Sequence, residues 1–202
     1  MNRMLKRLKS EDGAVSLLGT VAILGALAAF SIVFLMLGSA TTDQRNSSTA
    51  ADAAALGGAR HWADTINVSY QANLASPTNA TFWAFAGHPA TSFAAGSAAS
   101  ADAFAAANNN ELLSYLTMAP AKTYAKVRNF DTIEKSDTVK MRAESYAMLK
   151  VKDKGVCLRG GQIGLFWSGV CWMSMPPGLD PKAPPPPGFP PETTIHTRLV
   201  NQ

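Results

Sequence analysis

Residues 14–40 read AVSLLGTVAILGALAAFSIVFLMLGSA, a run of 27 positions that contains no Asp, Glu, Lys, Arg or His. An α-helix rises about 1.5 Å per residue, so this run would be roughly 40 Å long. A bilayer core is crossed by about 20 apolar residues. The sequence therefore predicts a transmembrane helix over residues 14–40.

The flanks of this run differ in charge, and the difference predicts an orientation. The basic residues before it are Arg3, Lys6, Arg7 and Lys9. Because positive flanks stay in the cytoplasm, we expect residues 1–13 to form a cytoplasmic tail of a single-pass protein of the cytoplasmic membrane, with the C-terminal domain outside. The alternative is a signal peptide cleaved after Ala40, and both predict export of residues 41–202.

The charge of the chain argues against a nucleic-acid partner. The totals are 18 Lys and Arg against 14 Asp and Glu, and the tail accounts for four of the basic and two of the acidic residues, which leaves 14 against 12. The remainder is thus nearly neutral, and no basic stripe with interleaved aromatic residues is evident. We expect no nucleic acid among the partners.

An alanine-rich segment follows the apolar run and predicts that the helix continues over residues 41–66. Its centre reads AADAAALGGA from Ala50 to Ala59. Alanine has the highest helix propensity, and small side chains allow close approach of a neighbouring helix. The pair Gly57-Gly58 would kink the helix, end it or allow tight packing.

The sequence predicts a small α+β domain over residues 67–175. Residues 97–107 are expected to form a second alanine-rich helix, with a further helical turn over 111–118. Apolar and polar residues alternate over 139–152, and this strand would pair with 122–130 as an antiparallel hairpin whose turn is residues 134–137. Aromatic residues between 82 and 93 are expected to pack onto the domain, and a sugar-binding platform is the alternative.

Residues 176–202 contain nine prolines between 176 and 191 and are predicted to be a tail of polyproline II structure, as a stiff spacer or a docking strip. Cys157 and Cys171 form an isolated pair, which predicts a disulfide, with two free thiols as the alternative.

Motifs of catalysis are not found in this sequence. It contains no Gly-rich phosphate loop, no His-Glu-x-x-His and no Gly-x-Ser-x-Gly. We therefore expect no catalytic residue, cofactor, metal ion or small-molecule substrate, and the protein is predicted not to be an enzyme.

The N-terminal quarter carries a family pattern. Glu11-Asp12-Gly13-Ala14-Val15 precedes the apolar run, Asp43-Gln44-Arg45 follows it, and the alanine block comes next. Over residues 10–60 this arrangement resembles the N-terminal domain of TadE/TadG-like proteins of the bacterial Tad system, which assembles Flp pili. The resemblance implies a structural component of a pilus assembly or secretion apparatus in the cell envelope, with the membrane and other Tad proteins as partners. The residues it implies for helix packing are Ala50, Ala51, Asp52, Ala54, Ala55, Leu56, Gly57 and Gly58.

The same resemblance raises the question of processing between Gly13 and Ala14. Pilins cut by prepilin peptidase carry a Glu at the fifth position after the cut, where this chain has Leu18. This departure favours a retained anchor over a cleaved minor pilin or pseudopilin, which is the alternative, together with an exported adhesion module. The expected fold is a long N-terminal helix that leads into a small antiparallel β domain, the lollipop form of pilins.

Overall fold

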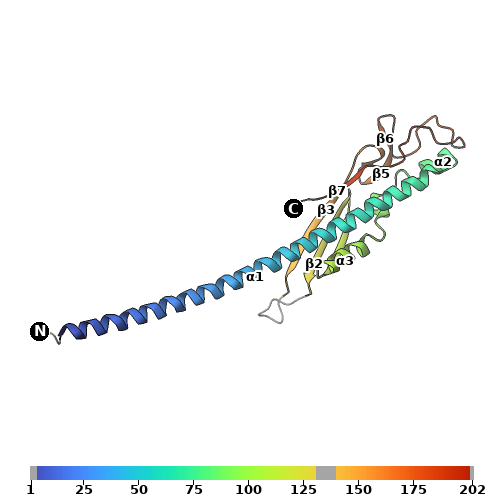
Figure 1. Cartoon of the computed structure of the whole chain (residues 1–202). Helices are drawn as coiled ribbons and strands as arrows, with labels where there is room; N and C mark the ends of the chain where they lie inside the picture. The colour runs from blue at the N-terminus through green and yellow to red at the C-terminus, as the bar shows by residue number, and fades with distance from the viewer. Residues whose placement is uncertain (1–3, 131–139, 201–202) are drawn as a thin grey trace. The chain divides into compact units, whose positions relative to one another are not determined.

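The computed structural model describes residues 4–130 and 140–200, and for residues 4–18 and 35–40 it describes the backbone alone. The chain divides into two compact units, Met1–Asp43 and Gln44–Gln202. The elements in chain order (Figure 1) are α1 (Met4–Leu74), α2 (Asn79–Trp83), the 3-10 helix η1 (Ala90–Phe93), α3 (Ser97–Ala107), β1 (Asn110–Met118), β2 (Lys122–Asn129), β3 (Arg142–Val151), β4 (Gly155–Arg159), β5 (Gln162–Trp167), β6 (Val170–Trp172) and β7 (Ile195–Leu199).

The predicted transmembrane helix is contradicted. Residues 14–40 do lie within α1, but in the described part of the chain no helix has the length and apolarity needed to cross a membrane. The prediction of a single-pass protein of the cytoplasmic membrane, with its tail inside and its domain outside, is wrong on the same finding.

The second half of α1 is a helix because one face of it is buried. Buried residues recur at intervals of three and four along this half, including Ala51, Ala55, Trp62, Ile66 and Tyr70. This spacing places them on one side of a helix. Gly57 and Gly58 neither end nor interrupt α1, which continues to Leu74.

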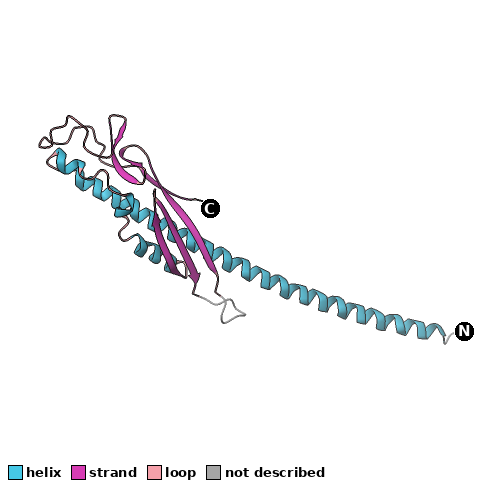
Figure 2. Ribbon diagram, turned by 180° about the vertical axis from the view of Figure 1, so that it is seen from behind, coloured by secondary structure: helices cyan, strands magenta, loops and turns pink. Residues whose placement is uncertain are grey.

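A four-stranded antiparallel sheet in the order β1-β2-β3-β7 covers this face of α1 (Figure 2). In β2 the side chains of Thr123, Ala125 and Val127 are buried and alternate with more exposed ones. The Thr123 hydroxyl donates a 3.1 Å hydrogen bond to the carbonyl oxygen of Ala55, so the buried face is the one against α1. The predicted α+β class and the pairing of β2 with β3 are confirmed, whereas the turn predicted at 134–137 lies outside the described residues.

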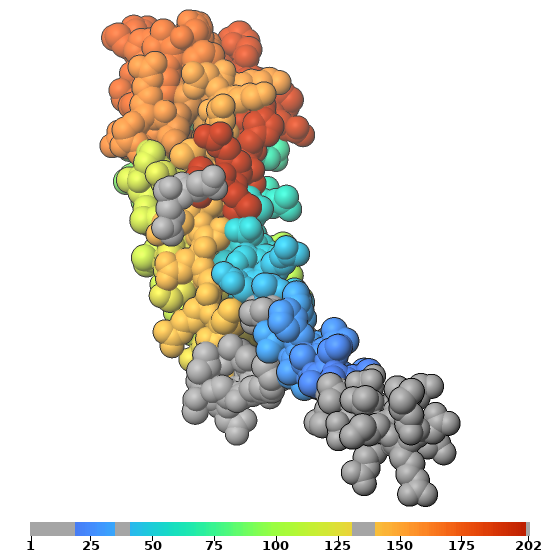
Figure 3. Space-filling model, turned by 90° about the vertical axis from the view of Figure 1, so that its left-hand side faces the viewer, coloured from blue at the N-terminus to red at the C-terminus, as the bar shows by residue number. Residues whose placement is uncertain are grey.

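A second antiparallel sheet, in the order β4-β5-β6, completes the domain. Its Ile163 and Leu165 are fully buried, and the same core contains the aromatic side chains of Tyr70 and Phe82. In the space-filling view the residues of β3 and β7 lie side by side, as their pairing requires (Figure 3).

Two strands were not expected from the sequence. Residues 111–118, predicted as a helical turn, belong to β1, which pairs with β2 through a register shift between Leu112 and Ser114. β7 follows the proline-rich segment and pairs with β3. That segment is held on the domain, because Tyr70 donates a 2.8 Å hydrogen bond to the Pro190 carbonyl and the Phe189 ring lies 4.7 Å from the Phe82 ring.

Candidate interaction surfaces

The alanine block, predicted to pack against partner helices, is buried inside the chain's own domain. Ala50, Ala51, Ala54 and Ala55 have no exposed surface, Gly57 and Gly58 are also buried, and Asp52 and Leu56 are half-buried. Its neighbours are the inner face of the sheet and α3, as the hydrogen bonds from Thr123 to Ala55 and from Ser100 to Gly57 show.

Gly57 and Gly58 allow this close contact. A methyl group added at Gly57 would overlap the Phe104 ring of α3, and one added at Gly58 would overlap the Tyr115 ring of β1. Both aromatic rings therefore lie directly on the backbone of α1, where any larger residue would displace them.

Asp52 is the charged residue of the alanine block, and a hydrogen bond within the domain holds its side chain in place. Its carboxylate accepts a 2.6 Å hydrogen bond from the hydroxyl of Ser145 on β3, a residue that is 8% exposed. A hydrogen bond to a charged acceptor is stronger than one between neutral groups. Asp52 thus fixes the position of β3 relative to α1.

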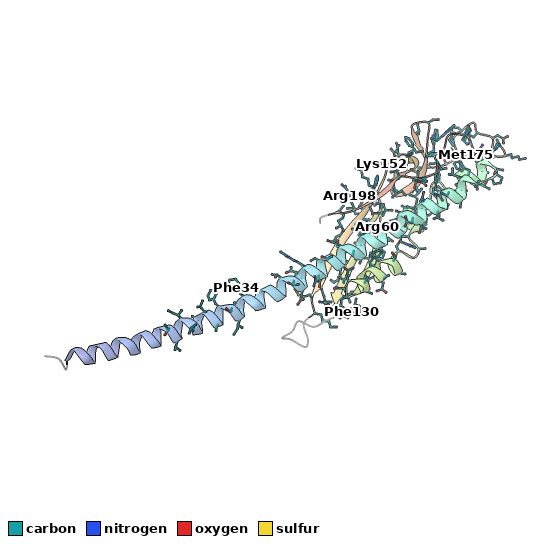
Figure 4. All side chains as sticks on the ribbon, in the orientation of Figure 1. Phe34, Arg60, Phe130, Lys152, Met175 and Arg198 are labelled. Carbon is teal, nitrogen blue, oxygen red and sulfur yellow. A yellow bond between two sulfur atoms is a disulfide. The ribbon has the colours of Figure 1, made fainter. Side chains whose placement is uncertain are left out.

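Among the residues whose side chains the structure describes, most of the exposed large apolar ones lie on α1, in the unit Met1–Asp43. Eight large side chains there are 53–67% exposed, and they are Val21, Ile23, Leu24, Leu27, Phe30, Ile32, Val33 and Phe34. At 3.6 residues per turn these positions fall on all sides of the helix. We call residues 21–34 the apolar stretch, and in Figure 4 Phe34 projects from α1 within it.

Polar groups inside the apolar stretch are satisfied within the helix. The Ser31 hydroxyl donates a 2.8 Å hydrogen bond to the carbonyl oxygen of Leu27, one turn earlier. The rings of Phe30 and Phe34 lie 5.7 Å apart along the same side. This segment is therefore suited to burial against another apolar surface.

The predicted processing position, Gly13 and Ala14, lies within the backbone of α1, and the structure describes no side chains there. The predicted disulfide between Cys157 and Cys171 is present and joins β4 to β6, with a Cα–Cα distance of 5.8 Å. Gly164 of β5 lies beneath it, because a methyl group there would contact the Cys157 sulfur at 3.0 Å.

The aromatic residues between 82 and 93 are mostly core residues. Phe82 is fully buried, and Trp83 and Phe85 are 3% and 7% exposed. Trp83 packs edge-on against Trp167 and Phe189. The packing interpretation is confirmed, and these side chains do not form an open sugar-binding platform.

Among the side chains that the structure describes, no group of three or more His, Cys, Asp or Glu residues is placed to hold a metal ion. Comparison of the chain with protein-family models, with curated proteins and with solved structures gives no match. The geometry of the two units therefore carries the functional argument, and it points to interaction surfaces.

Proposed function

We propose that the chain is a structural, non-catalytic component of a Tad/Flp-type pilus assembly or secretion apparatus, which acts by packing its apolar stretch against helices of other Tad proteins. Two observations support this proposal. The first is the resemblance of residues 10–60 to the N-terminal domain of TadE/TadG-like proteins. The second is the exposure of the apolar stretch, which is the observation that carries the argument.

A helix that is apolar on all sides is normally buried among other elements. Covering a large apolar side chain contributes about 1.5–3 kcal/mol when it passes from full exposure to full burial. Eight side chains that are 53–67% exposed would together contribute on the order of 10 kcal/mol. This gain is large enough to offset much of the entropy lost on association, which is estimated at roughly 4–15 kcal/mol.

The apolar stretch also contains the small residues that close helix packing needs. Gly25 lies near its middle, and a methyl group added there would meet no atom within 4 Å. Ala26, Ala28 and Ala29 follow it in sequence. A partner helix could therefore approach the backbone at this point while Val21 and Ile32, which lie on the same side of α1 as Gly25, pack beside it.

The alanine block does not compete for this role, because the sheet and α3 already cover it. The alanine block and the apolar stretch thus have different roles. The alanine block packs the rest of the domain onto α1, and the apolar stretch is available to partners.

The test is co-purification of the full-length chain with the pilus-assembly proteins of its own cells. The variant Leu24→Gln/Leu27→Gln/Phe30→Gln should lose these proteins, and Val68→Gln, an equally exposed apolar position on α1, should keep them. Unchanged co-purification of the triple variant would contradict the proposal. Mass spectrometry of the mature N-terminus separates an intact component, which begins at Met1, from a pilin cut after Gly13.

A further inference from the structure

The outer face of the four-stranded sheet combines basic and aromatic side chains. Because Thr123, Ala125 and Val127 point toward α1, the alternating residues of β2 point away from it. The outward residues of β2 are Lys122, Tyr124, Lys126 and Arg128, and those of β3 are Arg142, Glu144, Tyr146, Met148 and Lys150. Strand alternation therefore gathers basic and aromatic side chains on this face, although they are dispersed in the sequence.

The pairing of the strands arranges these side chains in rows across the sheet. Leu116, Tyr124 and Tyr146 are paired in register and form the central row, with the two tyrosine rings 5.0 Å apart and tilted by 48°. Both tyrosines are half-buried, and Leu116 is 53% exposed. The central row is thus an apolar and aromatic platform that remains open to solvent.

Cations lie on both sides of this platform. One adjacent row runs Met118, Lys122, Met148, Arg198 across all four strands. On the other side the row Ser114, Lys126, Glu144 is followed by Glu111, Arg128, Arg142. Lys150 of β3 and His196 of β7 are register partners, and they lie beyond the row that contains Lys122 and Arg198.

The outer face has an excess of positive charge. It carries six Lys and Arg residues and two Glu residues. Both Glu side chains are neutralised, because Glu144 lies 2.6 Å from Lys126 and Glu111 lies 2.5 Å from Arg128. The other four cations, which are Lys122, Arg142, Lys150 and Arg198, make no ion pair with any residue that the structure describes.

We propose that this outer face binds single-stranded nucleic acid, with bases on the Tyr124–Tyr146 platform and phosphates on the flanking Lys and Arg side chains. Aromatic side chains stack with unpaired bases, and a positively charged surface follows the backbone of the strand. A four-stranded antiparallel sheet with exposed aromatic residues is a known platform for this purpose. The carboxylates of an acidic protein segment would match the charge but would not themselves stack on the tyrosine rings, and a duplex would keep its bases hidden.

The experiment measures binding of a fluorescent single-stranded oligo-dT of about 15 nucleotides to the full-length chain by anisotropy, a length in the range of one such platform. If about four phosphates are neutralised, affinity should fall roughly 50-fold between about 50 and 200 mM salt. Lys122→Glu/Arg198→Glu should weaken binding at least about tenfold through loss of phosphate contacts. Tyr124→Ala and Tyr146→Ala should each weaken it about tenfold, whereas Tyr124→Phe and Tyr146→Phe should retain it.

Matched controls separate this surface from other charged segments. Arg159→Glu/Lys182→Glu reverses two exposed cations elsewhere in the domain and should leave binding unchanged. Neutralising Arg3, Lys6, Arg7 and Lys9 tests the N-terminal tail, and far-ultraviolet circular dichroism verifies that each variant is folded.

Four results would overturn the proposal. The first is that the wild-type chain does not bind the oligonucleotide, and the second is that the folded sheet variants bind it as well as the wild type does. The third is that only the variant of the N-terminal tail loses binding. The fourth is that Tyr124→Ala and Tyr146→Ala keep wild-type affinity while polyglutamate displaces the oligonucleotide. The last result would assign the face to acidic protein segments instead.

Discussion

The hydroxyl of Ser145 on β3 donates a hydrogen bond of 2.6 Å to the carboxylate of Asp52 on α1, and these residues are 93 positions apart in the chain. The bond ties the alanine block to the centre of the sheet. Asp52 is therefore retained among alanines because it is satisfied by the chain's own sheet, and the block is a packing surface within the domain.

Breaking this bond should destabilise the domain. Asp52→Ala leaves the nearly buried Ser145 hydroxyl without this partner, and Ser145→Ala leaves the carboxylate without it. A double-mutant cycle of urea unfolding should give a coupling free energy of about 1–3 kcal/mol. Asp64→Ala, an exposed carboxylate on the same helix, should change stability by less than about 0.5 kcal/mol. Strict additivity of the two mutations would show that the bond contributes nothing.

Gly58 is expected to tolerate no side chain. Gly58→Ala forces the Tyr115 ring away from α1 and should lower the free energy of unfolding by about 1–3 kcal/mol, measured by thermal or urea denaturation. The same substitution at Gly25 meets no neighbour within 4 Å and should not lower it. If Gly58→Ala were as stable as wild type, the close contact between α1 and β1 would be refuted.

The disulfide between Cys157 and Cys171 should contribute on the order of 3 kcal/mol, because it closes a loop of 14 residues in the unfolded chain. Guanidinium unfolding with and without dithiothreitol measures this contribution. Cys157→Ala/Cys171→Ala should be destabilised to the same extent and should not respond to the reductant. A chain that is equally stable under both conditions would count against a stabilising bridge.

Stability should decrease at alkaline pH through Tyr70. Burial raises the pKa of Tyr70 to about 12 from its ordinary value of 10. Between these values the unfolded chain loses a proton that the folded chain keeps, so stability is fully present below pH 10 and falls as pH rises toward 12. Tyr70→Phe should lower stability at neutral pH by losing the bond to Pro190, but should reduce the alkaline decline. Burial also raises the pKa of Tyr115 to about 12, so Tyr115 should account for part of the alkaline decline that remains in Tyr70→Phe. An alkaline decline of full size in Tyr70→Phe would disprove this assignment.

Local signals predicted part of the fold. Ser97–Ala107 is helical because its alanines favour the helix, and Asn109 then adopts a positive φ of 57° that ends it. β2 and β3 follow from alternation, and the disulfide follows from an isolated cysteine pair. The helix and the strands depend on residues that are close together in the sequence. The disulfide was predictable because the chain has no third cysteine that could pair instead.

The remaining features depend on contacts between distant residues. Leu112 and Leu116 fit a helical or a strand period equally well, and pairing with β2 decides for the strand. Gly57-Gly58 fitted a kink, a helix end or tight packing, and the structure has the tight packing, with Phe104 and Tyr115 against the two glycines of a continuous α1. The alanine block was predicted to pack against a partner helix, but its neighbours are the chain's own sheet and α3. Sequence periodicity shows that a face is buried and cannot distinguish between these two coverings. The basic and aromatic surface on the outer face of the sheet was not predicted, because its charged residues come from four strands that are separated in the sequence.

Site-specific photo-crosslinking tests the central claim, which is that the apolar stretch contacts helices of other Tad proteins. A photoreactive residue placed at Leu27 of the full-length chain in its own cells should crosslink to pilus-assembly proteins, identified by mass spectrometry. The same residue at Val68, which is equally exposed on α1, should not. Crosslinks from Leu27 to none of these proteins, or equal crosslinking from both positions, would contradict the account.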